Sequence, residues 1–344
     1  MTEHVAVFDF NGCALRFSST DRELTDWISS DFSTFAAPAG AEAGISITSV
    51  RGETLRKTLP RSAFKTRDWH ILPAPPGRRL VWYPEDALCE YEYRARRGLI
   101  TSPDPDLLKE ISYLLILSRA GEELDLRGLH RLHAGALGRA GKALIFCGAQ
   151  GAGKTTLLLE LLKDKDFSLL SDDTPLISAA GVVHPFPARI GLGEDSPHLK
   201  DHKDARSFKR RHYRPKLLVD IARQKIAVSG PLPPGLIFKL VRGKTPLFRR
   251  PAPFEAAAEL GKSLAAGWGV PQMAEYFLRL SPLDLCRKAG ILASRLRAAG
   301  ALLSRTDFII FETCPDPAAN AAALKAFIHS GSGPGGRALK FSRR

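Results

Sequence analysis

Long apolar runs and paired cysteines are both missing from this chain of 344 residues. No window approaches the ~18 uninterrupted apolar residues of a transmembrane helix, so we expect no membrane partner. Residues 1–6 lack a basic segment followed by an apolar core, which predicts no signal peptide. The five cysteines are scattered without a C-x-x-C pair, which argues against a disulfide framework and a zinc site. We therefore expect a cytoplasmic protein.

Nucleic-acid-binding motifs are absent as well, although the formal net charge is +14. There is no zinc finger, RNP-like stretch or basic-region heptad, and aromatic residues are sparse in the basic stretch at 200–216. We do not expect nucleic acid as a partner, and we interpret the charge as a solvated surface suited to nucleotides or acidic partners. The basic stretch predicts a mobile loop or a short helix near the site, or a plain solvated face.

The sequence does contain a glycine-rich loop of the form G-x-x-x-x-G-K-[ST] at residues 148–155. An apolar run at 143–147 precedes it and a helix-like run at 156–163 follows, which is the strand–loop–helix context that a phosphate-binding loop needs. Glycines let backbone N–H groups curl around an anion, and the helix adds its positive dipole end. The residues predicted to bind a nucleotide are Gly148, Ala149, Gln150, Gly151, Ala152, Gly153, Lys154, Thr155 and Thr156.

Two carboxylates complete the predicted chemistry of this loop. An apolar strand at 167–171 ends in Asp172 and Asp173, 17 residues (172 − 155) beyond Thr155. This spacing fits one helix and one strand, so the pair should emerge beside the loop at the C-terminal edge of a sheet. Lys154 is expected to reach the terminal phosphates, and the Thr155 hydroxyl to ligate Mg²⁺. One aspartate can then meet the metal while the other accepts a hydroxyl proton, and their order stays open.

A histidine precedes the loop strand. His133 is expected on a strand next to the loop, where a structural role and a role in the site are equally well supported.

Together, residues 132–136, 148–155 and 170–173 resemble the C-terminal domain of HPr serine kinase/phosphorylase, and more closely the HPr-kinase-related proteins. ATP-dependent phosphoenolpyruvate carboxykinase is similar more remotely. The resemblance is specific across about 129–195 and extends to about 330.

This resemblance implies an α/β fold with the P-loop nucleotide-binding core of the HPr kinase and carboxykinase type. It implies ATP and Mg²⁺ as cofactors, Lys154 at the β- and γ-phosphates, and Thr155 with the aspartates at the metal. One of Asp172 and Asp173 would be the general base, with His133 near the transferred phosphate. The family's later signature, rich in Glu, Arg and Gly, has no convincing copy after residue 181, which argues against HPr as the substrate and against phosphorylase activity.

The chain divides by pattern into a small, mostly β and antiparallel α+β domain at 1–103, a P-loop kinase domain at 104–330 and a disordered basic tail at 331–344. Asn11-Gly12 predicts a two-residue hairpin turn. Asp104 predicts the cap of a helix that ends near Gly121. Further strands are expected at 45–50, 80–83, 89–93, 236–241 and 308–311, and helices at 21–28, 253–264, 271–280, 282–303 and 316–328.

We interpret the whole as an ATP-dependent kinase that transfers the γ-phosphate to a serine-type hydroxyl on a peptide or protein. A small-molecule kinase or carboxykinase-like enzyme stays open, as does a non-catalytic module that binds a partner when ATP is present. The sequence leaves open whether the chain forms a homo-oligomer.

Overall fold

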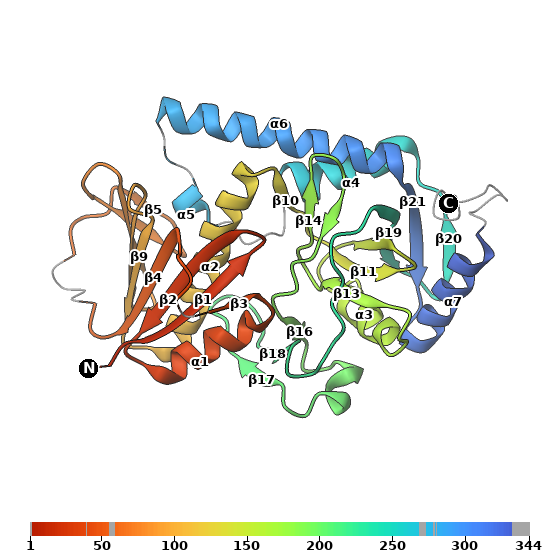
Figure 1. Ribbon diagram of the computed structural model, residues 1–344, viewed down its shortest axis with the longest axis horizontal. Coiled ribbons are helices and arrows are strands. Elements are labelled where there is room, and N and C mark those ends of the chain that lie inside the picture. Colours follow the sequence, from red (N-terminus) through yellow and green to blue (C-terminus); the bar gives the residue numbers. More distant parts are fainter. Residues whose placement is uncertain are drawn as a thin grey trace. The chain divides into compact units, whose positions relative to one another are not determined.

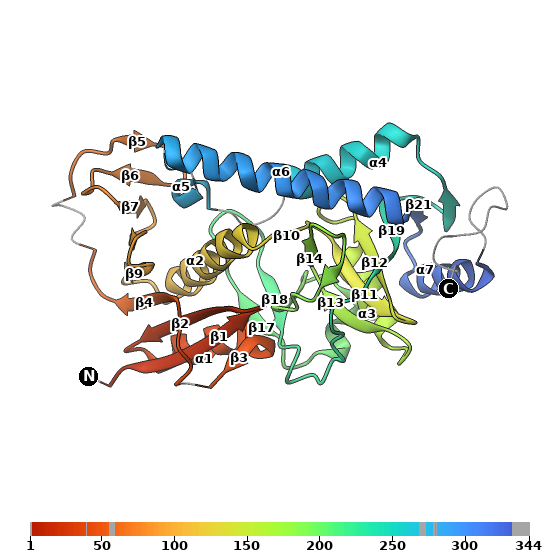
Figure 2. The ribbon, with the colours of Figure 1, turned by 45° about the horizontal axis from the view of Figure 1, so that its top comes forward.

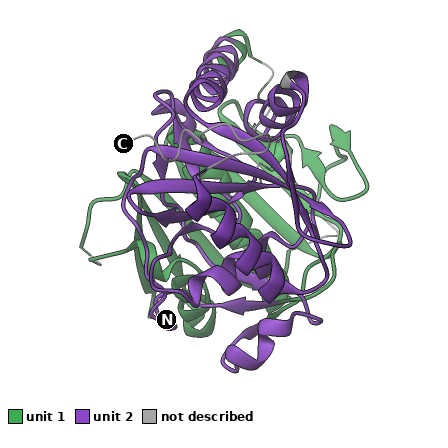
Figure 3. Cartoon of the chain, turned by 90° about the vertical axis from the view of Figure 1, so that its right-hand side faces the viewer, with its two compact units in different colours: residues 1–124, 207–216, 271–285 green, residues 125–206, 217–270, 286–344 purple. Residues whose placement is uncertain are grey.

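The computed structural model describes residues 2–38, 40–54, 59–267, 273–277, 279 and 281–331 (Figure 1). The chain forms two compact units, which Figure 3 colours separately. Unit 1 holds residues 1–124, 207–216 and 271–285, and unit 2 holds residues 125–206, 217–270 and 286–344. The expected domain limits at 103 and 330 stay predictions. Among the described helices, none combines the length and the apolar character that crossing a membrane requires.

Unit 1 begins with the hairpin that the sequence predicts. Strands β1 (His4–Phe10) and β2 (Cys13–Ser19) pair antiparallel, with Phe10 opposite Cys13. Asn11 and Gly12 take φ values of 53° and 86°, the left-handed conformations that a type I′ turn requires.

A nine-stranded sheet forms the body of unit 1, in the order β3-β1-β2-β4-β9-β8-β7-β6-β5. The prediction of an antiparallel module is wrong in part, because β2 pairs parallel with β4 and β4 pairs parallel with β9. Parallel neighbours need a crossover, and helix α1 (Arg22–Asp31), capped by Asp21, lies between β2 and β4 in the chain. The remaining strands are β3 (Ala36–Ala37), β4 (Ile45–Arg51), β5 (Phe64–Lys65), β6 (His70–Leu72), β7 (Arg78–Tyr83), β8 (Ala87–Glu92) and β9 (Arg97–Ser102).

Helix α2 (Pro105–Leu126) packs on this sheet, where the Ser112 hydroxyl lies 2.7 Å from the Ser49 hydroxyl of β4. Its first turn is capped as predicted, since the Asp104 carboxylate accepts hydrogen bonds from the backbone N–H groups of Asp106 and Leu107 at 2.8 and 3.3 Å. The predicted end near Gly121 is wrong: the helix runs on to Leu126. Leu124 is fully buried, and its burial outweighs the roughly 1 kcal/mol that a glycine costs inside a helix.

Unit 2 is built on a six-stranded sheet in the order β13-β11-β12-β19-β21-β20. β12, β19 and β21 run parallel, and β11 runs antiparallel to both β12 and β13, so β13 points the same way as β12. The predicted strands at 236–241 and 308–311 fall inside β19 and β21 and are confirmed. The strands are β11 (Gly135–Arg139), β12 (Lys142–Cys147), β13 (Ser168–Ser171), β19 (Pro234–Arg242), β20 (Leu247–Arg249) and β21 (Asp307–Thr313).

Helices cover both faces of this sheet, which makes unit 2 a three-layered α/β structure (Figure 2). Alternate residues of β12 face opposite ways, as the strand period requires: Leu144 and Phe146 join the core under α3 and α7, and Ile145 joins the core under α4 and α6. The helices are α3 (Lys154–Leu162), α4 (Pro253–Leu260), α6 (Pro282–Arg305) and α7 (Pro317–Ser330).

The predicted helices at 282–303 and 316–328 are confirmed as α6 and α7, the latter capped by Asp316. The helix predicted at 253–264 ends as α4 at Leu260 and continues as a π-helical turn, η4 (Gly261–Ala265). Of the helix predicted at 271–280, α5 (Ala274–Phe277) is described and the rest lies mostly outside the described residues, as do residues 332–344 of the predicted tail.

Short elements complete the described chain. Strands β10, β14 and β15 form a three-stranded sheet, and β16 pairs antiparallel with β18. Their bounds are β10 (Leu129–Arg131), β14 (Leu176–Ser178), β15 (Val183–His184), β16 (Ile190–Leu192), β17 (Arg206–Phe208) and β18 (Lys216–Val219), with 3₁₀ turns η1 (Ser33–Phe35) and η3 (Pro197–Asp201).

Candidate functional site

The glycine-rich loop leaves the end of β12 and enters α3. Gly148, Gly151 and Gly153 take φ values of 145°, 79° and 90°, which residues other than glycine rarely adopt. A Cβ on Gly148 would lie 2.9 Å from the Leu240 carbonyl oxygen on the neighbouring strand β19. The loop therefore follows a path that requires glycine for its backbone angles and, at Gly148, for its close approach to β19.

Lys154 is the first residue of α3, and its side chain folds back over the loop. The residue is buried, and its Nζ donates hydrogen bonds to the carbonyl oxygens of Gly148 at 2.8 Å and Ala149 at 3.3 Å. The ammonium group is thereby held at the loop that precedes the helix N-terminus. A positive side chain, glycine-rich backbone and the positive end of a helix dipole meet here, which together favour an anion.

Arg242 contacts the same loop, and the sequence analysis did not single it out. It is the last residue of β19, and its Nη2 and Nε donate to the Gly151 carbonyl oxygen at 2.7 and 3.2 Å. The signal that could have found it is a cation at the carboxyl end of a buried apolar strand. Recognising that signal also requires knowing that β19 lies next to β12, which periodicity alone does not give.

Asp172 follows β13 and lies close to α3, the helix that begins with Lys154. The contact runs through Gly135 of β11: a Cβ there would lie 2.9 Å from the Leu158 side chain of α3 and 3.1 Å from the Asp172 carbonyl oxygen. Asp172 is buried, and its Oδ2 accepts a hydrogen bond from the Gly191 backbone N–H at 3.3 Å. Glycine at 135 thus lets the end of β13 and the loop helix approach each other.

The structure brings Asp173 and His133 together. The His133 Nδ1 lies 3.2 Å from the Asp173 Oδ1, and the Ala134 N–H donates to the Asp173 carbonyl oxygen at 3.0 Å. The Asp173 side chain is 53% exposed, in contrast to buried Asp172. The placement of His133 on a strand is wrong: it lies between β10 and β11, which belong to different sheets, where the chain bends toward the end of β13.

These contacts define the site by its own residues. No protein-family model matches the chain, and no curated protein matches it.

The residues predicted to bind the metal carry oxygen donors, the type of ligand that Mg²⁺ prefers. Among the described residues, no group of three or more histidine, cysteine and carboxylate side chains is placed to hold a metal ion. Mg²⁺ does not need such a group, because it is usually bound through one or two carboxylates, phosphate oxygens and waters. The carboxylates of Asp172 and Asp173 and the hydroxyl of Thr155 are donors of this kind.

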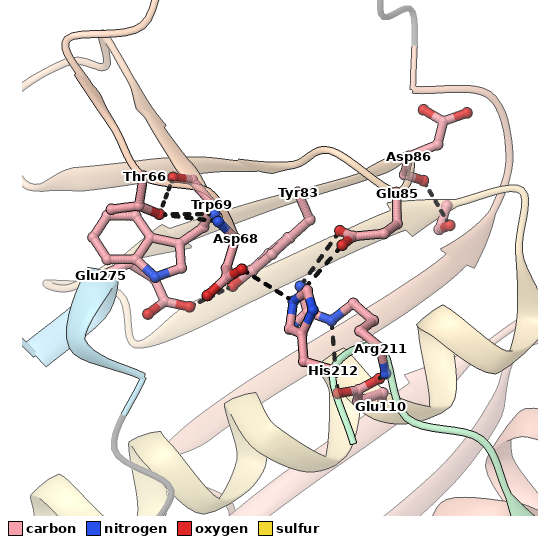
Figure 4. Close-up of polar contacts among 11 residues, drawn as sticks. Thr66, Asp68, Trp69, Tyr83, Glu85, Asp86, Glu110, Arg211, His212 and Glu275 are labelled. Carbon is pink, nitrogen blue, oxygen red and sulfur yellow. Dashed lines mark hydrogen bonds and ion pairs between the residues drawn. The ribbon is translucent and has the colours of Figure 1, made fainter. Parts of the chain in front are cut away.

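The central part of the basic stretch belongs to unit 1, where it meets acidic side chains (Figure 4). The Arg211 backbone N–H donates to Glu110 Oε2 at 2.9 Å, its Nη1 lies 3.6 Å from Glu85 Oε2, and its guanidinium lies 4.7 Å from the centre of the Tyr83 ring. His212 Nε2 lies 3.5 Å from Asp68 Oδ1. Residues 209–215 form a loop between β17 and β18, so the alternative of a short helix is wrong for this part, and ion pairs within unit 1 contact its side chains. The mobility of this loop stays a prediction.

A second polar cluster, buried in unit 2, has the appearance of a hydrolase triad. His130 Nδ1 lies 2.8 Å from Asp125 Oδ1 and its Nε2 lies 2.8 Å from the Ser294 Oγ. Arg295 Nη2 also contacts Asp125 Oδ2, at 2.6 Å. Burial tends to raise the pKa of Asp125, but the bonds from His130 and Arg295 outweigh it and lower that pKa. The carboxylate is thus already neutralised by Arg295, so we interpret the cluster as a structural tie between α2, β10 and α6.

Proposed function

We propose that this chain is an ATP-dependent phosphotransferase of the HPr-kinase-related type, which moves the γ-phosphate to a hydroxyl group. The observation that carries the proposal is the approach of the end of β13 to α3, the helix that begins with Lys154. A Cβ on Gly135 would lie 2.9 Å from the Leu158 side chain of α3 and 3.1 Å from the carbonyl oxygen of Asp172, the first residue of the aspartate pair. In phosphoryl transfer, positioning and charge neutralisation supply most of the catalysis, and these residues provide both.

Each residue takes a role from its surroundings. Lys154 leaves the carbonyls of Gly148 and Ala149 and neutralises the β- and γ-phosphates, while the loop N–H groups hold the phosphate oxygens. Thr155 and buried Asp172 would hold Mg²⁺, and the bound ion would supply positive charge at the phosphates.

Asp173 is the general base in this proposal. Its side chain is half exposed, so an acceptor hydroxyl can reach it, and its contact with His133 at 3.2 Å holds the carboxylate in one orientation. The hydroxyl proton moves to an Asp173 oxygen as the acceptor oxygen attacks the γ-phosphorus, and ADP leaves. The acceptor is a serine-type hydroxyl of a peptide or protein, or of a small molecule.

Calorimetry with Mg²⁺ and ATP, followed by transfer of labelled phosphate from ATP to candidate acceptors, tests this proposal. We expect Lys154→Ala to abolish transfer and to weaken ATP binding strongly. We expect Asp173→Asn and Asp172→Asn to lower transfer by about 10²–10⁴-fold while ATP binding is largely kept. Lys163→Ala, an exposed lysine directly after α3 that pairs with Glu160, is the matched control and should leave both unchanged.

The same experiment distinguishes the alternative functions from one another. Label that moves to a small acceptor but to no peptide or protein indicates a small-molecule kinase or carboxykinase-like enzyme. ATP that binds without any transfer indicates a nucleotide-gated binding module. A wild-type protein that binds no ATP contradicts the whole proposal.

A further inference from the structure

We propose that Arg242 is a positioning residue, which holds the glycine-rich loop in the shape that receives phosphates while Lys154 leaves the loop to bind them. This inference rests on the proposed function of the site. Lys154 and Arg242 thereby have separate tasks at the loop. Lys154 belongs to the glycine-rich motif, whereas Arg242 lies outside any motif found in the sequence.

Arg242 is well placed to act as a fixed support. Its backbone pairs with Thr313 on β21, and the Thr313 hydroxyl donates to the Val241 carbonyl oxygen at 3.3 Å. From this strand end its guanidinium uses two N–H groups, Nη2 and Nε, on the single carbonyl oxygen of Gly151. Because the strand is paired and two donors bind one oxygen, the contact restricts the Gly151 carbonyl group more than a single hydrogen bond from a flexible side chain would.

The effect of this contact depends on the position of the Gly151 carbonyl group in the loop. Because a trans peptide is planar, a tether on the Gly151 carbonyl also fixes the direction of the next N–H, that of Ala152. That N–H donates to the Ala149 carbonyl oxygen at 3.1 Å and closes the turn inside the loop. A glycine-rich segment has many accessible conformations, so fixing one peptide plane removes a large share of its freedom.

Lys154 holds the loop in a different way. Its hydrogen bonds to Gly148 and Ala149 use the same ammonium group that the proposed function assigns to phosphate. Those bonds are lost when a nucleotide binds, whereas the bond from Arg242 to Gly151 can persist. Arg242 therefore keeps the loop preorganised at the moment when Lys154 changes partner, and preorganisation increases affinity by lowering the cost of ordering.

The test compares Arg242→Met with Lys244→Met, an exposed cation two residues further along whose loss changes the net charge equally. We expect Arg242→Met to weaken binding of both ATP and ADP by about tenfold, with kcat at saturating ATP unchanged. Arg242→Lys should recover part of the affinity, because an ammonium can donate to the same carbonyl. Lys244→Met should bind as the wild type does.

A second measurement needs no nucleotide. Amide hydrogen exchange of residues 149–153 should be faster in Arg242→Met than in Lys244→Met, at equal melting temperature. Unchanged exchange and unchanged nucleotide affinity would overturn the inference. A loss of ATP affinity with ADP affinity intact would also overturn it, because Arg242 would then contact the terminal phosphate. If the wild type binds no nucleotide, the proposed function fails, and the exchange experiment still decides whether Arg242 orders the loop.

Discussion

At the scale of single residues, glycine is what permits the loop to meet its neighbours. Gly148 combines a φ of 145° with a 2.9 Å approach of its would-be Cβ to the Leu240 carbonyl oxygen. Backbone cannot move aside as a flexible side chain can, so any larger residue must displace the loop from β19. The same displacement would shift the Gly148 carbonyl that Lys154 contacts.

We expect Gly148→Ala to cost about 1–3 kcal/mol in the free energy of unfolding and to weaken ATP binding by more than about tenfold. Gly141→Ala is the control, because Gly141 has a φ of 70° but nothing within 4 Å of an added Cβ. That change should cost about 1 kcal/mol in stability and leave ATP affinity intact. Urea unfolding and calorimetry measure the two quantities, and equal ATP affinity in the two variants would contradict the argument.

At the scale of elements, α5 carries a buried acid into unit 1. The Tyr83 hydroxyl donates to Glu275 Oε1 at 2.8 Å, and Figure 4 shows the two side chains meeting. Burial raises the pKa of Glu275 above its ordinary value of 4.5, although the Tyr83 bond and the charges of Arg211 and Arg119 act to lower it. The folded protein therefore resists ionisation of Glu275 more than the unfolded chain does.

The raised pKa of Glu275 determines how the stability of the folded protein changes with pH. The stability associated with neutral Glu275 is fully present below pH 4.5 and is lost as the pH rises through the raised pKa of the folded state. Glu275→Gln keeps an acceptor for Tyr83 and cannot ionise. We expect this variant to match the wild type in acid and to melt at a higher temperature at pH 7. Melting curves from pH 4 to pH 8 measure this, and a Gln variant that is less stable at pH 7 would show that attraction to Arg211 dominates.

At the scale of the whole molecule, the net charge of +14 attracts polyanions without a motif to select them. Acidic residues of the same unit form ion pairs with part of the basic stretch, as the contacts of Arg211 and His212 show. Association with generic DNA would therefore rest on diffuse charge, which salt screens over about 8 Å at physiological ionic strength.

We expect binding to generic duplex DNA at low salt to disappear by about 0.15 M salt, while ATP affinity changes little. Fluorescence anisotropy of a labelled duplex across a salt series measures the first, and calorimetry at the same salt concentrations measures the second. DNA affinity that persists well above that salt concentration would indicate a nucleic-acid site and contradict our interpretation of the charge.

Local patterns determined much of this protein. The Asn11-Gly12 turn, the Asp104 cap and the strand–loop–helix around 148–155 follow from the conformational preferences of a few consecutive residues, and the structure has each of these elements where it was predicted. The spacing from Thr155 to Asp172 likewise limits the intervening chain to one helix and one strand, since a sheet edge must be reached within 17 residues (172 − 155).

Tertiary structure decided what no local pattern contains. The parallel pairing of β2 with β4, the continuation of α2 past Gly121 and the contact of Arg242 with Gly151 each depend on residues far apart in the sequence. Their energies come from burial and from backbone approach, which only the assembled sheets and helices define. The sequence by itself thus specified the loop, and the tertiary structure placed β19 beside it and brought Asp173 to His133.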